Sequence, residues 1–134
     1  MGQITPAGLT SLLTGEDWRY VGATDQPAFN STWANIGTQP KLAFRRREAG
    51  VVDVQGTVTP GASAVSGTPI FTLPEGYRPS VVSYVPIVAT TLAPAYQGTF
   101  VIVSAAGVVT PYYTLTTPQI LIYAQIFLTT PDVA

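Results

Sequence analysis

Residues 51–59 read VVDVQGTVT, and this stretch decides the fold. Apolar and polar side chains alternate along it, and a period of two is typical of a strand in an antiparallel sheet with one face buried and the other in water. Residues 41–48 precede it across the dipeptide Ala49-Gly50, which suits a two-residue hairpin loop. The two expected faces are Val52, Val54, Gly56 and Val58 on one side, and Val51, Asp53, Gln55 and Thr57 on the other.

The chain beyond residue 59 repeats this pattern of short apolar segments separated by turn residues. Residues 96–104 and 108–114 flank Ala105-Ala106-Gly107, a three-residue loop whose glycine stands where a positive φ is needed. Pro86 interrupts the segment 81–91 and indicates an edge strand or a bulge. With 32–36 before the first hairpin and 70–73 and 119–128 in addition, about eight strands predict an all-β fold, an antiparallel β-sandwich or a jelly-roll-like knob.

The last expected strand, residues 119–128, is apolar on both faces. Ile120, Ile122, Ala124 and Ile126 alternate with Leu121, Tyr123, Gln125 and Phe127. A strand of this kind is a central strand of a sandwich, or it turns one face to a neighbouring subunit. Tyr123 and Phe127 are therefore candidates for contacts between subunits.

The first 30 residues differ from the β-rich remainder, so we divide the chain into an arm at 1–30 and a head domain at 31–134. Thr5, Pro6 and Gly15 suit the cap, first position and end of a short helix. Two or three turns of helix are marginal in water, so this helix needs a docking partner. The candidates for anchoring and assembly are Ile4, Leu9, Leu12, Leu13 and Trp18.

The composition argues against several classes of partner. Charged residues make up 10% of the chain and hydrophobic residues 46%, whereas soluble domains carry about 25% charged residues. A surface this poor in charge suits a protein that buries much of itself against copies of itself or against another protein. The net charge of −1 gives no broad basic face for nucleic acid, and no apolar run is long enough for a membrane span.

The residue types needed for catalysis are scarce. The chain has no histidine and no cysteine, which removes the usual general bases, metal ligands and nucleophile triads. Glu48 and Asp53 flank the first hairpin and could act as a carboxylate pair, as in a depolymerase, only if both were buried. We expect both to be solvated or paired with arginine, and we therefore expect no enzyme activity, cofactor or metal.

The run Arg45-Arg46-Arg47 is the one dense basic cluster of the sequence. In a strand, Arg45 and Arg47 share a face opposite Arg46. They either form a charged edge that blocks unwanted strand pairing or make ion pairs between subunits. A minor alternative is binding to an anionic cell-surface polymer.

Several aromatic residues could serve as flat platforms for sugar rings, because an exposed tyrosine or tryptophan combines an apolar face with a polar edge. Tyr112 and Tyr113 are neighbours in a strand, so one points inward and the other outward. Trp33 and Tyr96 complete the candidate glycan-binding set. The alternative for each ring is packing in the core or at a subunit interface.

Four segments together resemble a known family. Their sequences are WANIG at 33–37, KLAFRR at 41–46, VDVQGTV at 52–58 and IFTLPEGYRP at 70–79. In this order they resemble the C-terminal head domain of siphophage receptor-binding and minor tail proteins, over about residues 31–128. The most specific piece runs from Leu73 to Pro79.

The resemblance implies a β-sandwich head that packs as a homotrimer in the virion, at a tail fibre or baseplate, where it touches host cell-surface polysaccharide. Members of the family carry the head behind a long collagen-like or coiled stalk, and no Gly-X-Y run or sustained heptad occurs here. The alternative is therefore a capsid decoration or head-fibre protein that the arm docks to the shell. Both interpretations make other virion proteins its partners.

Overall fold

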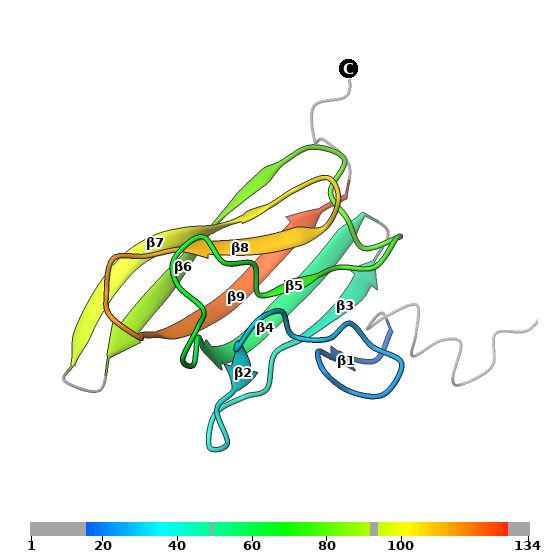
Figure 1. Ribbon diagram of the computed structural model, residues 1–134. Helices are drawn as coiled ribbons and strands as arrows, with labels where there is room; N and C mark the ends of the chain where they lie inside the picture. The colour runs from blue at the N-terminus through cyan, green and yellow to red at the C-terminus, as the bar shows by residue number, and fades with distance from the viewer. Residues whose placement is uncertain (1–15, 49, 92–93, 129–134) are drawn as a thin grey trace, which may run out of the picture.

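The computed structural model describes residues 16–48, 50–91 and 94–128, and this part of the chain is all-β, as the sequence predicts. The expected helix and the candidate residues Ile4, Leu9, Leu12 and Leu13 lie outside the described residues. Figure 1 shows the strands, which are β1 (Arg19–Tyr20), β2 (Ala34–Asn35), β3 (Ala43–Glu48), β4 (Val51–Thr59), β5 (Phe71–Thr72), β6 (Ser83–Thr91), β7 (Ala95–Val103), β8 (Val108–Tyr112) and β9 (Gln119–Phe127).

The strands form one antiparallel sheet that curls until its two ends face each other. Its order is β1-β3-β4-β9-β6-β7-β8-β5, and β2 pairs separately with β4. The rings of Phe44 on β3 and Phe71 on β5 stack at 5.9 Å between centroids, although their strands stand near opposite ends of this order. The curled sheet therefore encloses its core as a sandwich does. The side of the sheet that points away from the core is convex.

The two halves of the sheet meet where β9 pairs with β6, and this junction is short. Eight residues of β9, Ile120–Phe127, pair with β4. Only three residues of β6, Val88–Thr90, pair with β9. Extending that register places Pro86 opposite Tyr123, where the pairing has already stopped. Because proline has no N–H to donate, it cannot continue a ladder on that side. Within the described residues the first half of β6 is paired with β7 alone, but β6 as a whole lies inside the sheet between β9 and β7 and is not the edge strand that Pro86 could indicate.

The core follows the alternation seen in the sequence. Val52, Val54 and Val58 of β4 are buried, as are Ile120, Ile122 and Ile126 of β9. Expressed as area removed from water, each such side chain stabilises the fold by about 1.5–3 kcal/mol. The described part of the arm joins the same body, since β1 pairs with β3 and Val21 lies in the core.

The segment WANIG has a structural role. Trp33 is buried, donates its indole N–H to the carbonyl of Thr68 at 3.2 Å, and meets Tyr113 edge to face. The side-chain oxygen of Asn35 accepts the backbone N–H of Leu42 at 2.9 Å. This segment therefore ties two loops to the sheet, because each bond satisfies a backbone group that has no strand partner.

The segment from Leu73 to Pro79 is a turn that bonds to itself and packs against β3 and the β7–β8 loop. The backbone N–H of Tyr77 bonds to the carbonyl of Pro74 at 3.1 Å, and the Tyr77 ring meets Phe44 edge to face. Arg78 donates its Nε–H to the carbonyl of Leu73 at 2.8 Å. The N–H of Leu73 bonds to the carbonyl of Gly107 at 2.8 Å, so the turn also holds the β7–β8 loop.

Candidate interaction surface

The most distinctive surface of the molecule is the outer face of the sheet over β6–β9. The alternation that buries one side of these strands turns large apolar side chains outward on the other. Those at least partly exposed are Tyr84, Val88, Tyr96, Phe100, Tyr112, Tyr123 and Phe127. We call this set the outer face.

Three rings on neighbouring strands form the centre of the outer face. Tyr84 on β6 lies 6.0 Å from Phe100 on β7, and Phe100 stacks on Tyr112 of β8 at 5.5 Å with 28° between the ring planes. Cross-strand aromatic pairs of this kind stabilise a sheet by about 0.2–1 kcal/mol. We call these three residues the aromatic ladder.

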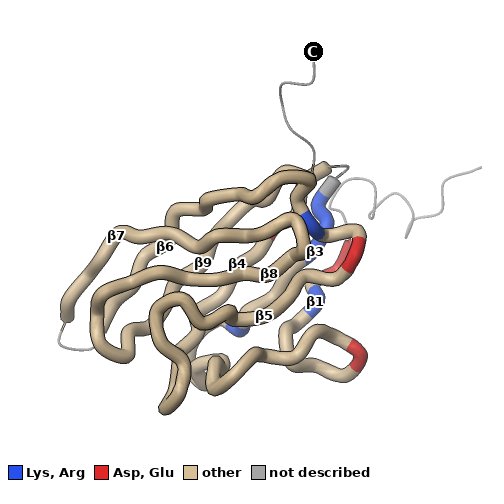
Figure 2. The backbone as a smooth tube through the Cα atoms, turned by 45° about the horizontal axis from the view of Figure 1, so that its top comes forward, with Lys and Arg blue, Asp and Glu red and all other residues tan. Residues whose placement is uncertain are grey.

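Charge is segregated away from this face. The sequence has no charged residue between Arg78 and Asp132, a stretch that includes all of β6–β9. Figure 2 shows the lysines, arginines and acidic residues gathered around β1, β3 and the nearby loops, with β6–β9 free of them. The long stretch without charged residues is a sequence signal from which the position of the outer face could have been predicted.

The structure divides the predicted aromatic candidates into two groups. Tyr96 and Tyr112 are exposed, and so are the predicted intersubunit residues Tyr123 and Phe127. Trp33 and Tyr113 are buried at 3% and 9% exposure, so neither ring is the open platform that the sequence interpretation requires. Their mutual edge-to-face packing explains the burial.

Tyr113 is polar at a buried position. Its hydroxyl has no hydrogen-bond partner within the described residues. Burial raises the pKa of Tyr113 above its ordinary value, because the charged phenolate is disfavoured away from water. The group therefore stays neutral and serves packing.

Arg45 and Arg47 lie on one face of β3, as predicted, and both meet Asp53 of the same chain. The Nε of Arg47 donates to Asp53 Oδ2 at 3.0 Å, and the Nε of Arg45 lies 3.5 Å from that oxygen without a hydrogen bond. The ring of Trp18 covers the Arg45 guanidinium at 4.4 Å, a cation–π contact. These contacts are within one chain, and contacts of either arginine with another subunit stay a prediction.

A shallow hollow of about 270 Å³ adjoins this ion pair. Tyr123 and the amides of Gln55 and Gln125 line it together with Trp18, Arg45, Arg47, Asp53 and Ala124. Trp18, predicted as an anchoring residue of the arm, therefore packs here against the sheet. The side chain of Glu48, the other member of the predicted carboxylate pair, lies outside the described part.

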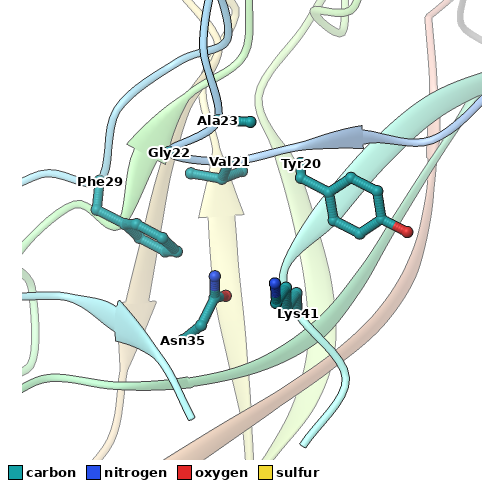
Figure 3. A pocket seen from close by; sticks show the side chains of 7 residues that line it. All are labelled: Tyr20, Val21, Gly22, Ala23, Phe29, Asn35 and Lys41. Atoms are coloured by element: carbon teal, nitrogen blue, oxygen red, sulfur yellow. The ribbon is translucent and has the colours of Figure 1, made fainter. Parts of the chain in front are cut away.

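A larger hollow of about 640 Å³ lies beside β1, and Figure 3 shows its lining. The ring of Phe29 and the amide of Asn35 are turned toward the space below Val21, and the hydroxyl of Tyr20 points away from it. Among the described residues that line it, Lys41 is the charged one. Since none of these described lining residues carries a carboxylate or an imidazole, they offer hydrogen bonds to a small polar molecule but no acid–base pair.

Glu16 fixes the start of the described chain to β3. Its carboxylate accepts the Arg46 backbone N–H and the Arg19 Nε–H, both at 3.2 Å. Burial raises the pKa of Glu16, but hydrogen bonds from Tyr77, Arg46 and Arg19 outweigh burial and hold the pKa below its ordinary value. Burial, together with the bond to Glu16, raises the pKa of Tyr77. This cluster anchors the arm and contains no nucleophile or metal site.

Among the described residues, no group of three or more His, Cys, Asp or Glu side chains could hold a metal ion. In that same part of the chain, no helix has the length and apolar character needed to cross a membrane. Comparison of the chain with protein-family models, with curated proteins and with solved structures found no match.

Proposed function

We propose that the chain is a non-catalytic structural protein of a bacteriophage particle and forms a homotrimeric knob on its surface. The observation that carries this proposal is the outer face, whose strands are rich in aromatic residues and free of charge, and which no other described part of the chain covers. A domain that keeps such a face suits an assembly, because association removes apolar area from water. Two parts of the proposal, the location on a phage particle and the threefold symmetry, rest on the resemblance of residues 31–128 to siphophage head domains.

The proposed position is at the tail, where the knob takes part in attachment to host cell-surface glycan. Support for glycan contact comes from the ring of Tyr96 on β7, which is 75% exposed and lies opposite the hydroxyl-bearing Thr90 of β6. An aromatic platform flanked by hydrogen-bonding groups fits a sugar ring. The alternative is a capsid decoration or head-fibre protein docked through the arm.

The experiment that tests the proposal has two parts. Light scattering or native mass spectrometry of the purified chain is expected to give the mass of a trimer. Quantitative mass spectrometry of purified particles is expected to find the chain at a few to a few dozen copies. Copies in the hundreds would place it on the shell instead, and its absence from particles would refute the virion assignment.

A second measurement separates attachment from decoration. A tail knob is expected to bind host cell walls, and no binding at millimolar sugar would count against that role. A decoration protein is expected to lose attachment to the particle when residues 1–15 are removed, while the head keeps its fold and mass.

A further inference from the structure

The outer face exposes more apolar surface than a single domain usually keeps in water. Tyr84, Tyr96 and Tyr123 are 66%, 75% and 60% exposed. With about 200 Å² for a large aromatic side chain, the exposed parts of the outer face amount to roughly 700 Å². The largest apolar patch of a typical monomer covers about 300–600 Å², whereas each partner of a stable interface contributes about 800 Å². The face therefore has the size of an interface.

The absence of charge restricts what can cover this face. A charged partner surface would lose its water against strands β6–β9, which carry no countercharge of their own, at a cost of several kcal/mol per ion. The occupant must therefore be apolar and uncharged over the contact. The outer face itself is such a surface, so a second copy of this chain fits.

The shape of the sheet determines how two copies can meet. The outer face is the convex side of the curl, and it bends where β6 and β9 part beyond Val88 and Leu121. This divides it into two slopes, the aromatic ladder on β6–β8 and a β9 slope formed by Leu121, Tyr123 and Phe127. Two convex faces placed against each other touch along a strip and leave slopes uncovered. In a ring, the aromatic ladder of each copy can pack on the β9 slope of the next copy. Both slopes of every copy are then covered.

We propose that copies of this chain associate head to tail, with the aromatic ladder of one copy packed on the β9 slope of the next. This inference rests on the proposed function and specifies how its subunits meet. A repeated contact between two different surfaces closes into a ring when the rotation permits, and the proposed ring has three members.

A notch between the two slopes supports this packing. It has a volume of about 260 Å³ and is lined by Pro86, Ile87, Val88, Leu121 and Tyr123. The notch lies where β6 and β9 part beyond Val88 and Leu121. Its apolar lining and its position on the convex face suit an aromatic side chain from a neighbouring copy, which is the kind of buried anchor on which interfaces depend.

The absence of cysteine from the chain permits a direct test by cross-linking. Thr110→Cys places a thiol beside the ladder, and Gln125→Cys places one on the β9 slope, and neither change removes a ring. Within one chain β6 and β7 lie between β8 and β9, so β8 and β9 are three strand spacings apart, about 14 Å in total. A linker of about 8 Å cannot bridge that distance. Gly98→Cys replaces Thr110→Cys if circular dichroism shows that the first variant is misfolded.

The double variant is expected to give covalent trimers with a thiol-reactive linker, and each single variant is expected to give no cross-linked product. A matched double variant at exposed positions away from the face, Ala28→Cys with Ala62→Cys, is expected to give none. Covalent dimers from a single variant would show a symmetric contact and overturn the inference. So would an associated double variant that does not cross-link, or a chain that is monomeric at every concentration. A monomeric chain would also refute the trimer of the proposed function, whereas a trimer that does not cross-link would overturn this inference alone. The copy number in particles tests the virion assignment separately.

Discussion

The backbone of Leu42 passes so close to Gly56 that a Cβ atom on Gly56 would lie 2.4 Å from the Cα of Leu42. Gly56 also has a φ of +144°, in a region that other residues rarely adopt. We predict that Gly56→Ala lowers the free energy of unfolding by at least about 2 kcal/mol, from backbone strain and from the clash. Denaturant unfolding measures the loss.

The matched control is Gly98→Ala on β7, where an added Cβ meets no atom within 4 Å. This change is expected to leave the free energy of unfolding unchanged or to raise it slightly, because alanine loses less backbone entropy on folding. Equal losses from the two substitutions would contradict the role given to Leu42.

The Glu16 cluster predicts a pH-dependent contribution to stability. The folded pKa of Glu16 lies below its ordinary value, so its contribution is present above an unfolded pKa of about 4.3 and is lost as the pH falls through the folded value. Glu16→Gln is therefore expected to be less stable than the wild type at pH 7, and the difference is expected to close toward pH 3. Thermal unfolding across this range measures it.

A double-mutant cycle separates the Glu16 hydrogen bonds from general effects of acid. Tyr77→Phe removes one donor to Glu16 and keeps the ring on Phe44. We expect it to destabilise the wild type more than the Glu16→Gln variant at pH 7, since hydrogen bonds to a charged acceptor are stronger. Strictly additive effects would show that the two groups are not coupled.

The aromatic ladder predicts a change in association without a change in fold. Tyr84 is 66% exposed in the single chain, so Tyr84→Lys creates no cavity. A lysine buried against an uncharged partner is expected to raise the dissociation constant at least about 30-fold, the effect of a hot-spot residue. Sedimentation velocity over a concentration series measures it.

Tyr20→Lys is the matched control, because Tyr20 is also an exposed aromatic residue but lies on β1 beside the charged part of the molecule. It is expected to leave the association unchanged. Dissociation by Tyr20→Lys in place of Tyr84→Lys would move the contact to the other end of the sheet.

Asp53 pairs with both Arg45 and Arg47, so removing its charge is expected to destabilise the fold. The Asp53 side chain is 14% exposed, whereas those of Arg45 and Arg47 are 23% and 35% exposed. Asp53→Asn removes the shared carboxylate charge and is expected to lower the free energy of unfolding by about 1–2 kcal/mol, allowing for solvent around the arginines. Asp17→Asn, at an exposed position, is expected to change it by less than about 0.5 kcal/mol.

The parts of the fold that the sequence predicts are those with a local signal. The alternation in VVDVQGTVT predicts β4 with its bounds, and the glycine of the 105–107 loop has the expected positive φ. β1 escapes sequence-based prediction, because Arg19 and Tyr20 have no periodic neighbours and pair only where β3 offers an edge. Its formation depends on tertiary contacts and not on local propensity.

The candidate surface could be predicted only in part for the same reason. That Tyr112 and Tyr113 point to opposite sides follows from their adjacency, but which of them is buried depends on the curl of the sheet. Trp33 has no alternating pattern around it, and its burial comes from Thr68 and Tyr113, both far away in the sequence. The outer face is formed by strands whose order, β9-β6-β7-β8, differs from their order in the chain.

The central place of β9 has a consequence for synthesis on the ribosome. β9 is the last strand of the described chain to be translated, yet it joins β4 on one side and β6 on the other. Until residues 119–127 leave the exit tunnel, the earlier strands form two half-sheets with no strand between them. Such non-local pairing slows folding and exposes strand edges while it is incomplete. The nascent chain therefore depends on β9 to close the sheet, and truncation before Gln119 is expected to yield an aggregating product.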